Sequence, residues 1–484
     1  IAFFYCPNRL VFDNWDKFYG EGKNADYEEY VEIFIPQLKC PTEGWAEGTI
    51  ADYLGIPTKK EVHDVSALPF RMLAMIYNEY YRDEQRMAKA LVSKGDADQT
   101  GTNGDNYIND LQNGGKVPKT CRLFDYFTGS KLELQAGDPV MIPVGEQAPV
   151  VGNGVIIGLK GSSQDFPLVL REIGKNVTNP EGTALQAGNQ DQLGKEIGYI
   201  YSGNPQFKLE ETYGVGLSQN PENSGMIADL TKAQGITVRD FKKLLMIQQT
   251  LQNIEDGGSR YIEQLYKRWG VKANELELEI PKFLGSTSTI LNMAMVAGTA
   301  QENFGNFTGL SNTFTQSHIF TTRFKQHGYI FGIITIRPQN TYENGIHKSL
   351  VKKTIQDYFT PEMSYFGPDI IRNYEIYSDK EDSKDDEMFG IRNYGDELRY
   401  IPNKVTGQIR TNSEFSQAYK TYSINYDTRP LNNEDFILSS KKQVDKTLKD
   451  EDTKIHQFTF QAQLEIDIVR NLPKNANADM LIRF

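Results

Sequence analysis

The sequence predicts a mainly β protein in which short strands are separated by long polar loops. Of its 484 residues 39% are apolar, and the chain holds 41 Gly, 20 Pro, 26 Tyr and 26 Phe. Aromatic residues favour strands, whereas Gly and Pro favour turns. The clearest strand lies in HGYIFGIITIRPQNTYENG (327–345), which alternates apolar residues and ends at Arg337 and Pro338.

The strand predicted at 329–336 is apolar on both faces. At a period of two, one face holds Tyr329, Phe331, Ile333 and Thr335, and the other holds Ile330, Gly332, Ile334 and Ile336. An antiparallel strand facing water would have one polar face. We therefore expect another part of the chain, or another copy of it, to cover the outer face.

Residues 1–18 predict a buried strand that breaks at Pro7 and Asn8, with Trp15 and Phe18 packing beyond the turn. An acidic loop follows at 21–47.

The next predicted element is an amphipathic helix at 66–92. Pro69 suits a first helical turn. The residues that recur at helical spacing on one face are Phe70, Leu73, Tyr77, Tyr80 and Met87. The polar stretch 93–118 reads as a loop.

Residues 145–226 have no sustained helical period and carry short apolar runs among many Gly, Asn and Gln. At about 80 residues this span far exceeds the usual connection of about 4–6 residues. Its apolar runs favour a folded, β-type insertion.

A helix is predicted to start after Thr237, with Asp240 completing a capping box and Ile236 stapled onto Phe241. It stops at the glycines 257–258, and a second short helix follows at 259–269. From residue 275 onward the pattern returns to short strands and polar loops. The charged run at 379–387 is predicted to be a solvated tip.

Charge and cysteine content exclude several classes of protein. A net charge of −12 and a pI near 5.2 argue against a dedicated nucleic-acid binder, while leaving local basic patches open. Cys6, Cys40 and Cys121 show no metal-ligand spacing, which indicates reduced thiols and a cytosolic folding site. The apolar runs are too short for a membrane span. Because the chain opens without Met inside a strand-like run, we expect its true N-terminus to lie upstream.

No catalytic, cofactor-binding or metal-binding residue emerges from the motifs. No two of the five histidines lie at i, i+4, and HExxH and GxSxG are absent. His327 is interpreted as structural. Two phosphate-loop look-alikes, 154–163 and 188–196, have the wrong spacing.

Two further motifs imitate binding sites. DADQTG (96–101) resembles the start of a calcium loop, but Tyr107 stands where the bidentate Glu belongs, which leaves only an adventitious surface cation site. The helix pair 237–269 imitates a DNA-reading helix-turn-helix. Its residues Tyr261, Ile262 and Leu265 are interpreted instead as packing residues.

Five ordered blocks carry a resemblance to a known family. They are FFYCPNRLVFDNWDKFYGE (3–21), RMLAMIYNEYYRDEQ (71–85), GGSRYIEQLYKRWGV with PKFLGSTSTI (257–271 and 281–290), HGYIFGIITIRPQNTYENGI (327–346) and YIPNKVTGQIR (400–410). In these blocks the chain resembles the major capsid protein of the microviruses, small icosahedral single-stranded-DNA bacteriophages, and of their gokushovirus branch in particular. It departs from the family at 413–422, which lacks the usual tryptophan-histidine pair, and after 125–132, which lacks a tryptophan-proline signature.

The resemblance implies an eight-stranded antiparallel jelly roll of the viral capsid type, with long inter-strand insertions and a few short helices. Residues 1–144 would form the first part of this body and include the helix 66–92. Residues 145–226 would be an insertion, the candidate for a surface protrusion at the three-fold axes. Residues 227–484 would supply the helix pair 237–269 and the rest of the body with its surface loops.

The function implied is structural and not enzymatic. Copies of the chain would self-assemble, in the cytoplasm of a host bacterium, into the T=1 icosahedral capsid of a virion that encloses circular single-stranded DNA. The implied partners are a small basic DNA-binding protein, a pilot or minor virion protein and a bacterial surface receptor used in host attachment. The alternative is a jelly-roll glycan-binding protein or glycosidase, since a fold alone does not fix a function. A glycosidase would need two facing carboxylates.

Overall fold

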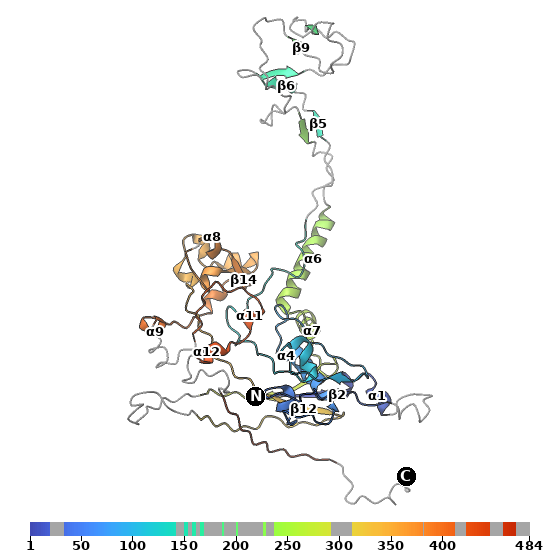
Figure 1. The fold of residues 1–484 in the computed structure, drawn as a ribbon. Helices are drawn as coiled ribbons and strands as arrows, with labels where there is room; N and C mark the ends of the chain where they lie inside the picture. The colour runs from blue at the N-terminus through green and yellow to red at the C-terminus, as the bar shows by residue number, and fades with distance from the viewer. Residues whose placement is uncertain are drawn as a thin grey trace, which may run out of the picture. The chain divides into compact units, whose positions relative to one another are not determined.

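The computed structural model describes residues 1–19, 33–141, 150–152, 157–160, 165–168, 186–187, 200–201, 226–228, 237–291, 312–380, 382–411, 423–445 and 458–470 (Figure 1). The chain divides into two compact units. One comprises Ile1–Ala136 and Gln252–Phe484, and the other is Gly137–Leu251.

The described secondary structure consists mostly of small sheets together with some helices. In the first unit the strands are β1 (Ala2–Pro7), β2 (Gln37–Lys39), β3 (Val65–Ser66), β4 (Gln99–Thr100), β11 (Lys282–Ser286), β12 (Gly328–Ile333), β13 (Asp369–Arg372) and β14 (Met388–Arg392). They form the sheets β11-β1-β12, β3-β2-β4 and β13-β14. All these pairings are antiparallel except that of β2 with β4.

The helices of the first unit are mostly short. They are α1 (Trp15–Phe18), α3 (Ile50–Tyr53), α4 (Leu68–Tyr80), α5 (Tyr107–Asp110), α7 (Tyr261–Trp269), α8 (Asp382–Asp385), α9 (Gln408–Thr411), α11 (Glu434–Ile437) and α12 (Lys441–Asp445). Helix α6 (Val238–Gly257) runs across the boundary between the units.

The described strands of the second unit form three antiparallel pairs: β5 (Val150–Gly152) with β10 (Met226–Ala228), β6 (Ile157–Lys160) with β7 (Asp165–Leu168), and β8 (Gln186–Ala187) with β9 (Ile200–Tyr201). The two phosphate-loop look-alikes lie largely outside the described residues, and so does Ile236.

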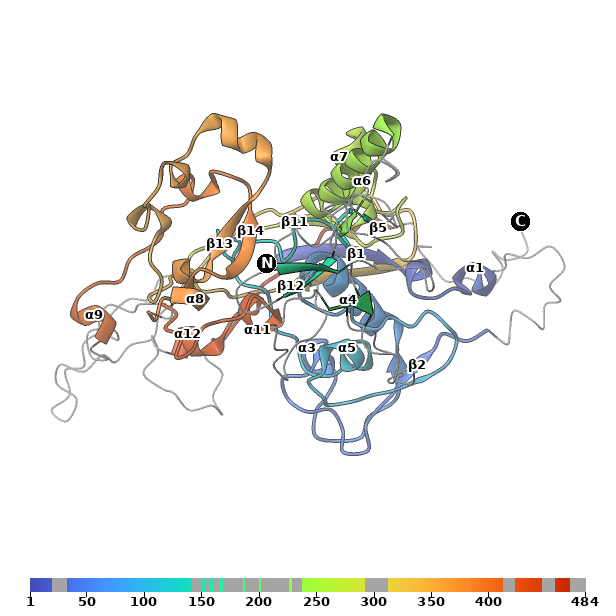
Figure 2. The same cartoon turned by 90° about the horizontal axis from the view of Figure 1, so that it is seen from above.

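Strand β1 is the centre of the sheet β11-β1-β12. Phe4 lies opposite Phe283 on one side and Phe331 on the other. Residues directly opposite each other share a face of the sheet. Phe4, Cys6 and Phe331 therefore point together and pack into one core against Leu68, Met72 and Ile76 of α4. Both views show β1 and β12 beside α4 (Figures 1 and 2).

The predicted break after this strand is confirmed. Strand β1 ends at Pro7, and the N–H of Asn8 donates to the carbonyl of His327 at 3.0 Å. Beyond the turn, Trp15 is buried and stacks on Phe18 with ring centroids 5.6 Å apart.

The helix predicted at 66–92 is shorter than expected, because α4 ends at Tyr80. The carboxylate of Asp83 accepts the backbone N–H groups of Gln85 at 3.1 Å and Arg86 at 2.9 Å. An Asp that bonds nearby backbone amides offers them an alternative to the helical ladder. A turn therefore replaces the helix after Tyr80.

The amide of Asn78 fixes the chain beyond this turn. Its Nδ2 donates to the carbonyl of Ala90, and its Oδ1 accepts the N–H of Ala90, both at 2.8 Å. The side chain thus replaces a strand partner for the extended segment that follows, and both groups are buried.

Helix α4 is buried on two sides. Phe70 and Tyr77 from the predicted apolar face, together with Met87, enter a second core with Trp45, which stacks on Phe70. The other side carries Met72 and Ile76 into the core beneath β1. The helix consequently lies between two cores, with α3 and α5 beside it (Figure 2).

A third core joins β13 and β14 to segments distant in sequence. Its buried members are Tyr126, Phe127, Ile371, Ile376, Phe389 and Phe436.

The prediction that residues 379–387 form a solvated tip is wrong for Asp385, which is 8% exposed. Arg429 Nη2 bonds the carboxylates of Asp379 at 2.8 Å and Asp385 at 2.7 Å, and these two ion pairs tie α8 to the segment that carries Arg429.

Candidate assembly surfaces

The outer face of the β11-β1-β12 sheet is covered in part by the chain itself. Phe320 packs on Phe3 with ring centroids 5.7 Å apart, and Phe324 packs on Tyr5 at 4.4 Å. The hydroxyl of Tyr5 donates to the carbonyl of Gln326 at 2.7 Å. Another part of the same chain therefore covers the outer face of β1, the strand that pairs with the one for which a cover was expected.

This cover does not extend over β12. The strand ends at Ile333, three residues before the predicted end. Ile330 is 48% exposed, and Tyr329, Ile334 and Ile336 are exposed as well. Strand β12 is also an edge of its sheet. An exposed apolar edge strand offers both unpaired backbone groups and apolar area to a partner.

Helix α7 exposes a second apolar surface. Tyr261, Tyr266 and Trp269 are all exposed, Trp269 at 64%, and no residue of α7 is buried. Tyr261 was expected to be a packing residue, and in the single chain that expectation is wrong. Ile262 and Leu265 are half-buried.

Arg260 sets the position of α7. Its guanidinium forms ion pairs with Glu84 and, at 3.7 Å, with Glu79. Its Nη2 also donates to the carbonyl of Asn78 at 3.0 Å. A guanidinium has five donors in a fixed fork, so it can join two carboxylates and a backbone carbonyl at once. The start of α7 is therefore tied to the C-terminal end of α4.

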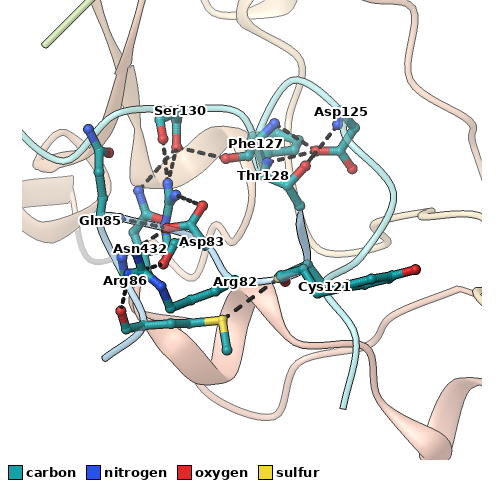
Figure 3. A network of polar contacts seen from close by, with 12 residues as sticks. Arg82, Asp83, Gln85, Arg86, Cys121, Asp125, Phe127, Thr128, Ser130 and Asn432 are labelled. Atoms are coloured by element: carbon teal, nitrogen blue, oxygen red, sulfur yellow. Dashed lines mark hydrogen bonds and ion pairs between the residues drawn. The ribbon is translucent and has the colours of Figure 1, made fainter. Parts of the chain in front are cut away.

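A second arginine joins three distant segments just beyond α4 (Figure 3). Arg86 Nε donates to Asn432 Oδ1 at 2.8 Å, Nη1 bonds Asp83 Oδ2 at 3.2 Å, and Nη2 donates to the carbonyl of Ser130. Asn432 in turn donates to Ser130 Oγ at 3.1 Å and to the carbonyl of Phe389 at 3.0 Å. Burial lowers the pKa of Arg86, and the Asp83 carboxylate opposes that shift. The network is a polar joint between the second and third cores.

The calcium-loop look-alike has no free carboxylate cluster. Asp96 accepts both of its bonds from Asn14 Nδ2, at 2.8 and 2.7 Å. Asp98 accepts the N–H of Gln37 at 2.9 Å and lies 3.6 Å from the ammonium of Lys39. Over the described ranges, no three His, Cys, Asp or Glu side chains are grouped to hold a metal ion.

His327 lies among aromatic side chains of the segment after β1. His327 stacks on Tyr19 with ring centroids 4.7 Å apart, and its Nε2 lies 3.3 Å from the Tyr19 hydroxyl. The ring centroids of His327 and Trp15 are 5.9 Å apart. This agrees with the interpretation of His327 as a structural residue.

One buried carboxyl has a strongly altered pKa. Glu375 accepts the N–H of Arg372 at 3.0 Å and the hydroxyl of Tyr126 at 3.2 Å. Burial raises the pKa of Glu375 to about 7, against the opposing effects of these hydrogen bonds and of Lys348. Glu375 is buried and bonded to Tyr126 of the third core, so its protonation affects the stability of that core.

Comparison with known proteins shows the family of this chain. The model of the family described as "Capsid protein (F protein)" matches residues 1–480. This chain belongs to that capsid protein family. It is 30% identical over 452 residues to the capsid protein VP1 of Bdellovibrio phage phiMH2K, a match that covers 90% of this chain and 77% of the relative.

Two further capsid proteins named VP1 are similar over most of their length. That of Spiroplasma virus 4 is 28% identical over 453 residues, covering 92% of this chain and 78% of the relative. That of Chlamydia phage 1 is 28% identical over 477 residues, covering 90% and 79%. All three relatives belong to microviruses.

The family assigns this chain to the virion as a structural major capsid protein that assembles with copies of itself. Nothing in the comparisons supports the glycan-binding or glycosidase alternative. In the part of the chain that the structure describes, no helix is both long and apolar enough to cross a membrane.

The sequence indicated one of these features and not another. The doubly apolar pattern of 329–336 pointed to β12. The joint made by Arg86, Ser130 and Asn432 gave no such signal, because its members are separated by 44 and 346 residues.

Proposed function

We propose that this capsid protein forms the T=1 icosahedral shell of a gokushovirus-type phage and encloses circular single-stranded DNA. The observation that carries the proposal is the family match over residues 1–480, together with exposed apolar side chains on β12 and α7. A shell of identical subunits closes when one subunit contact repeats around symmetry axes. The shell has no catalytic task, and its assembly takes place in the cytoplasm of the bacterial host.

Electron microscopy of the purified protein tests this proposal. We expect closed particles of one diameter when the chain is expressed with its viral partners. A small homogeneous oligomer that never closes under these conditions would contradict the proposal.

We further propose that the body completes an eight-stranded antiparallel jelly roll in the assembled shell. Two segments support this. Residues 458–470 alternate Phe458, Phe460, Leu464, Ile466 and Ile468 with mostly polar residues, yet they form no strand, and their apolar side chains from Phe460 onward are exposed. A period-2 pattern of this kind is typical of a strand with one buried face. Residues 312–324 likewise form neither a helix nor a strand, and they contact β1 through Phe320 and Phe324.

Protection of these amides distinguishes the free subunit from the particle. In a jelly roll the backbone N–H groups of 458–468 bond to a neighbouring strand and exchange slowly with solvent. Hydrogen exchange of assembled particles should show protection of alternate amides in this segment. Exchange as fast as in the free subunit would refute the added strand.

We propose that another molecule neutralises most of the genome charge. A net charge of −12 cannot balance phosphate, since DNA binding depends on Lys and Arg displacing counterions. A small basic protein would fill that role, with a pilot or minor virion protein as a further partner. Purified subunits should therefore bind single-stranded DNA weakly and release it as salt rises. Salt-resistant binding by the subunit alone would contradict this division of labour.

We propose that residues 145–226 form an outward protrusion at the three-fold axes used to attach to a bacterial surface receptor. The support is the length and the Gly/Asn/Gln-rich composition of the span, because long loops outside a core are commonly functional. Loop closure cost grows slowly with length, so the body tolerates such an insertion. Replacing 145–226 by a short Gly/Ser linker should leave particles that assemble but fail to attach. Failure to assemble would make the span an assembly element instead.

A further inference from the structure

Strand β12 has a free edge that lacks the usual protection. Within the described residues, it pairs with β1 on one side and with no strand on the other. Edge strands commonly carry charges, a proline or a bulge that prevents pairing with another chain. Residues 328–336 contain neither a charged residue nor a proline. The pairing of β12 with β1 also runs from Ala2 to Pro7 without a shift in register. The edge is therefore open to a further strand.

The pairing with β1 determines which backbone groups of β12 point to this edge. In an antiparallel pair, alternate residues direct both their N–H and C=O groups toward the partner strand. The carbonyl of His327 accepts the N–H of Asn8 at 3.0 Å. Pro7, which has no N–H, lies opposite Gly328. The odd-numbered residues of β12 therefore bond to β1, and the even-numbered residues direct their backbone groups to the free edge.

The side chains along the edge are self-complementary in one antiparallel register. When two copies of the strand lie with Gly332 opposite Gly332, Ile330 of each copy lies opposite Ile334 of the other. Gly328 and Ile336 form the next pair outward. Ile330 and Ile334 are both exposed in the single chain. Side chains directly opposite each other on one face of a sheet pack together, so this register buries two pairs of isoleucines.

The charges that flank the strand favour the same register. Lys325 then lies opposite Gln339, and Arg337 lies opposite His327. A shift of two residues in one direction would place Arg337 opposite Lys325, and like charges directly opposite each other are destabilising. A shift in the other direction would bring Pro338, which has no N–H, into the ladder.

We propose that β12 strands from two copies of this chain pair in antiparallel orientation across a two-fold axis, with Gly332 on the axis. The partner is a second copy because the family assembles from copies of one chain. An antiparallel pair of identical strands is also the self-complementary contact that a two-fold axis creates. The inference rests on the proposed icosahedral shell, which has two-fold axes, and it adds the strand and the register of one contact.

The contact would join two small sheets into a larger one. The sheet β11-β1-β12 of each copy has three strands, so the pair forms a continuous sheet of six. The competing occupant of the edge is the segment 458–470 of the same chain, whose pattern also predicts a strand. Only the second copy places the thiols of two different chains next to each other, and crosslinking between chains therefore separates the two occupants.

The first experiment oxidises assembled particles of the double variant Ile330→Cys/Ile334→Cys and separates the chains under denaturing conditions. Opposite Cα atoms in a hydrogen-bonded antiparallel pair lie about 5.5 Å apart, within the range of about 4.4–6.8 Å for disulfides. We expect most chains as covalent dimers and none as higher oligomers, because each edge has one partner. If this variant does not assemble, Tyr329→Cys/Thr335→Cys gives the same readout at the neighbouring pair.

The single variants are the matched controls. In the proposed register, position 330 of one copy is four residues along the strand from position 330 of the other, which is about 13 Å. Ile330→Cys and Ile334→Cys should each remain monomeric after oxidation. The wild-type chain controls for the native thiols Cys40 and Cys121, and Cys6 is buried.

Hydrogen exchange of wild-type particles measures the same contact without a substitution. The amides of Ile330 and Gly332 point to the free edge, so they should exchange at least about tenfold more slowly in particles than in free subunits. The amides of Tyr329, Phe331 and Ile333 bond to β1 and should be protected in both states.

The outcomes separate this inference from the proposed function. Normal particles with neither dimers nor added protection would overturn the two-fold contact and leave the shell intact. Added protection without dimers would show that another segment of the same chain occupies the edge, and dimers from a single variant would overturn the register. Wild-type chains that never close into particles would overturn the shell itself, and the β12 inference with it.

Discussion

Arg86 and Asn432 are hydrogen-bonded across 346 residues of sequence, with Arg86 Nε donating to Asn432 Oδ1 at 2.8 Å. This bond joins the turn after α4 to the loop before α11, and Ser130 completes the joint by accepting from both residues. It connects parts of the capsid protein whose apolar cores are separate.

Replacing Arg86 should therefore weaken the subunit strongly. Arg86→Met leaves Asp83, Ser130 and Asn432 without their shared donor, and removing one partner from a buried charged network costs about 3–5 kcal/mol. Urea denaturation of unassembled subunits measures the loss. The exposed Lys89→Met is the control and should change the free energy of unfolding by less than about 0.5 kcal/mol. Equal effects of the two changes would refute the role of the joint.

Asn78→Ala should release the segment that follows α4. The change removes both hydrogen bonds to Ala90 and leaves its buried N–H and C=O unpaired, which costs about 1–3 kcal/mol per unsatisfied group. Hydrogen exchange of the Ala90 amide should accelerate at least tenfold. The exposed Asn109→Ala serves as the comparison and should leave that amide unchanged. An unchanged rate in Asn78→Ala would show that other contacts hold the segment.

Glu375 should make stability depend on pH. Its pKa is raised by burial to about 7, so between its unfolded pKa of about 4.3 and pH 7 the folded state binds more protons than the unfolded state. The free energy of unfolding therefore falls as pH rises through this window and levels off above pH 7.

The isosteric Glu375→Gln removes that dependence while keeping an acceptor for Tyr126. We expect the variant to match the wild type near pH 4.5 and to exceed it at pH 8 by up to about 3 kcal/mol. Urea midpoints of both proteins at several pH values test the sign. A difference that does not change with pH would mean that folding does not raise the pKa of Glu375.

Ile334→Glu should block assembly without unfolding the subunit. The side chain is exposed beside the β12 edge, so a carboxylate there costs the free subunit little. Buried in a subunit contact without a partner, the same charge would be strongly unfavourable. Particle yield should fall at least tenfold while the urea midpoint of the subunit stays unchanged. Gln339→Glu, also exposed, is the matched control, and normal yield from Ile334→Glu would exclude this surface from the shell contacts.

Local patterns determined several elements of this capsid protein. The strand before Pro7, the cap at Thr237 and the helix ending at the glycines 257–258 were all predicted, and the structure confirms them: Thr237 Oγ1 accepts the N–H of Asp240 at 3.1 Å, and α6 ends at Gly257. Caps, proline breaks and glycine stops act within a few residues. They can therefore be read from the sequence alone.

Tertiary structure decided where local preference failed. The helical period of 66–92 continues past Tyr80, but Asp83 bonds the amides that the helix would need, and Asn78 pairs with Ala90 instead. Asp385, within a run of charges, is buried because Arg429 reaches it from 44 residues away. A sequence pattern describes only a residue's neighbours along the chain. Burial and ion pairing depend on which distant segments lie next to that residue in the folded protein.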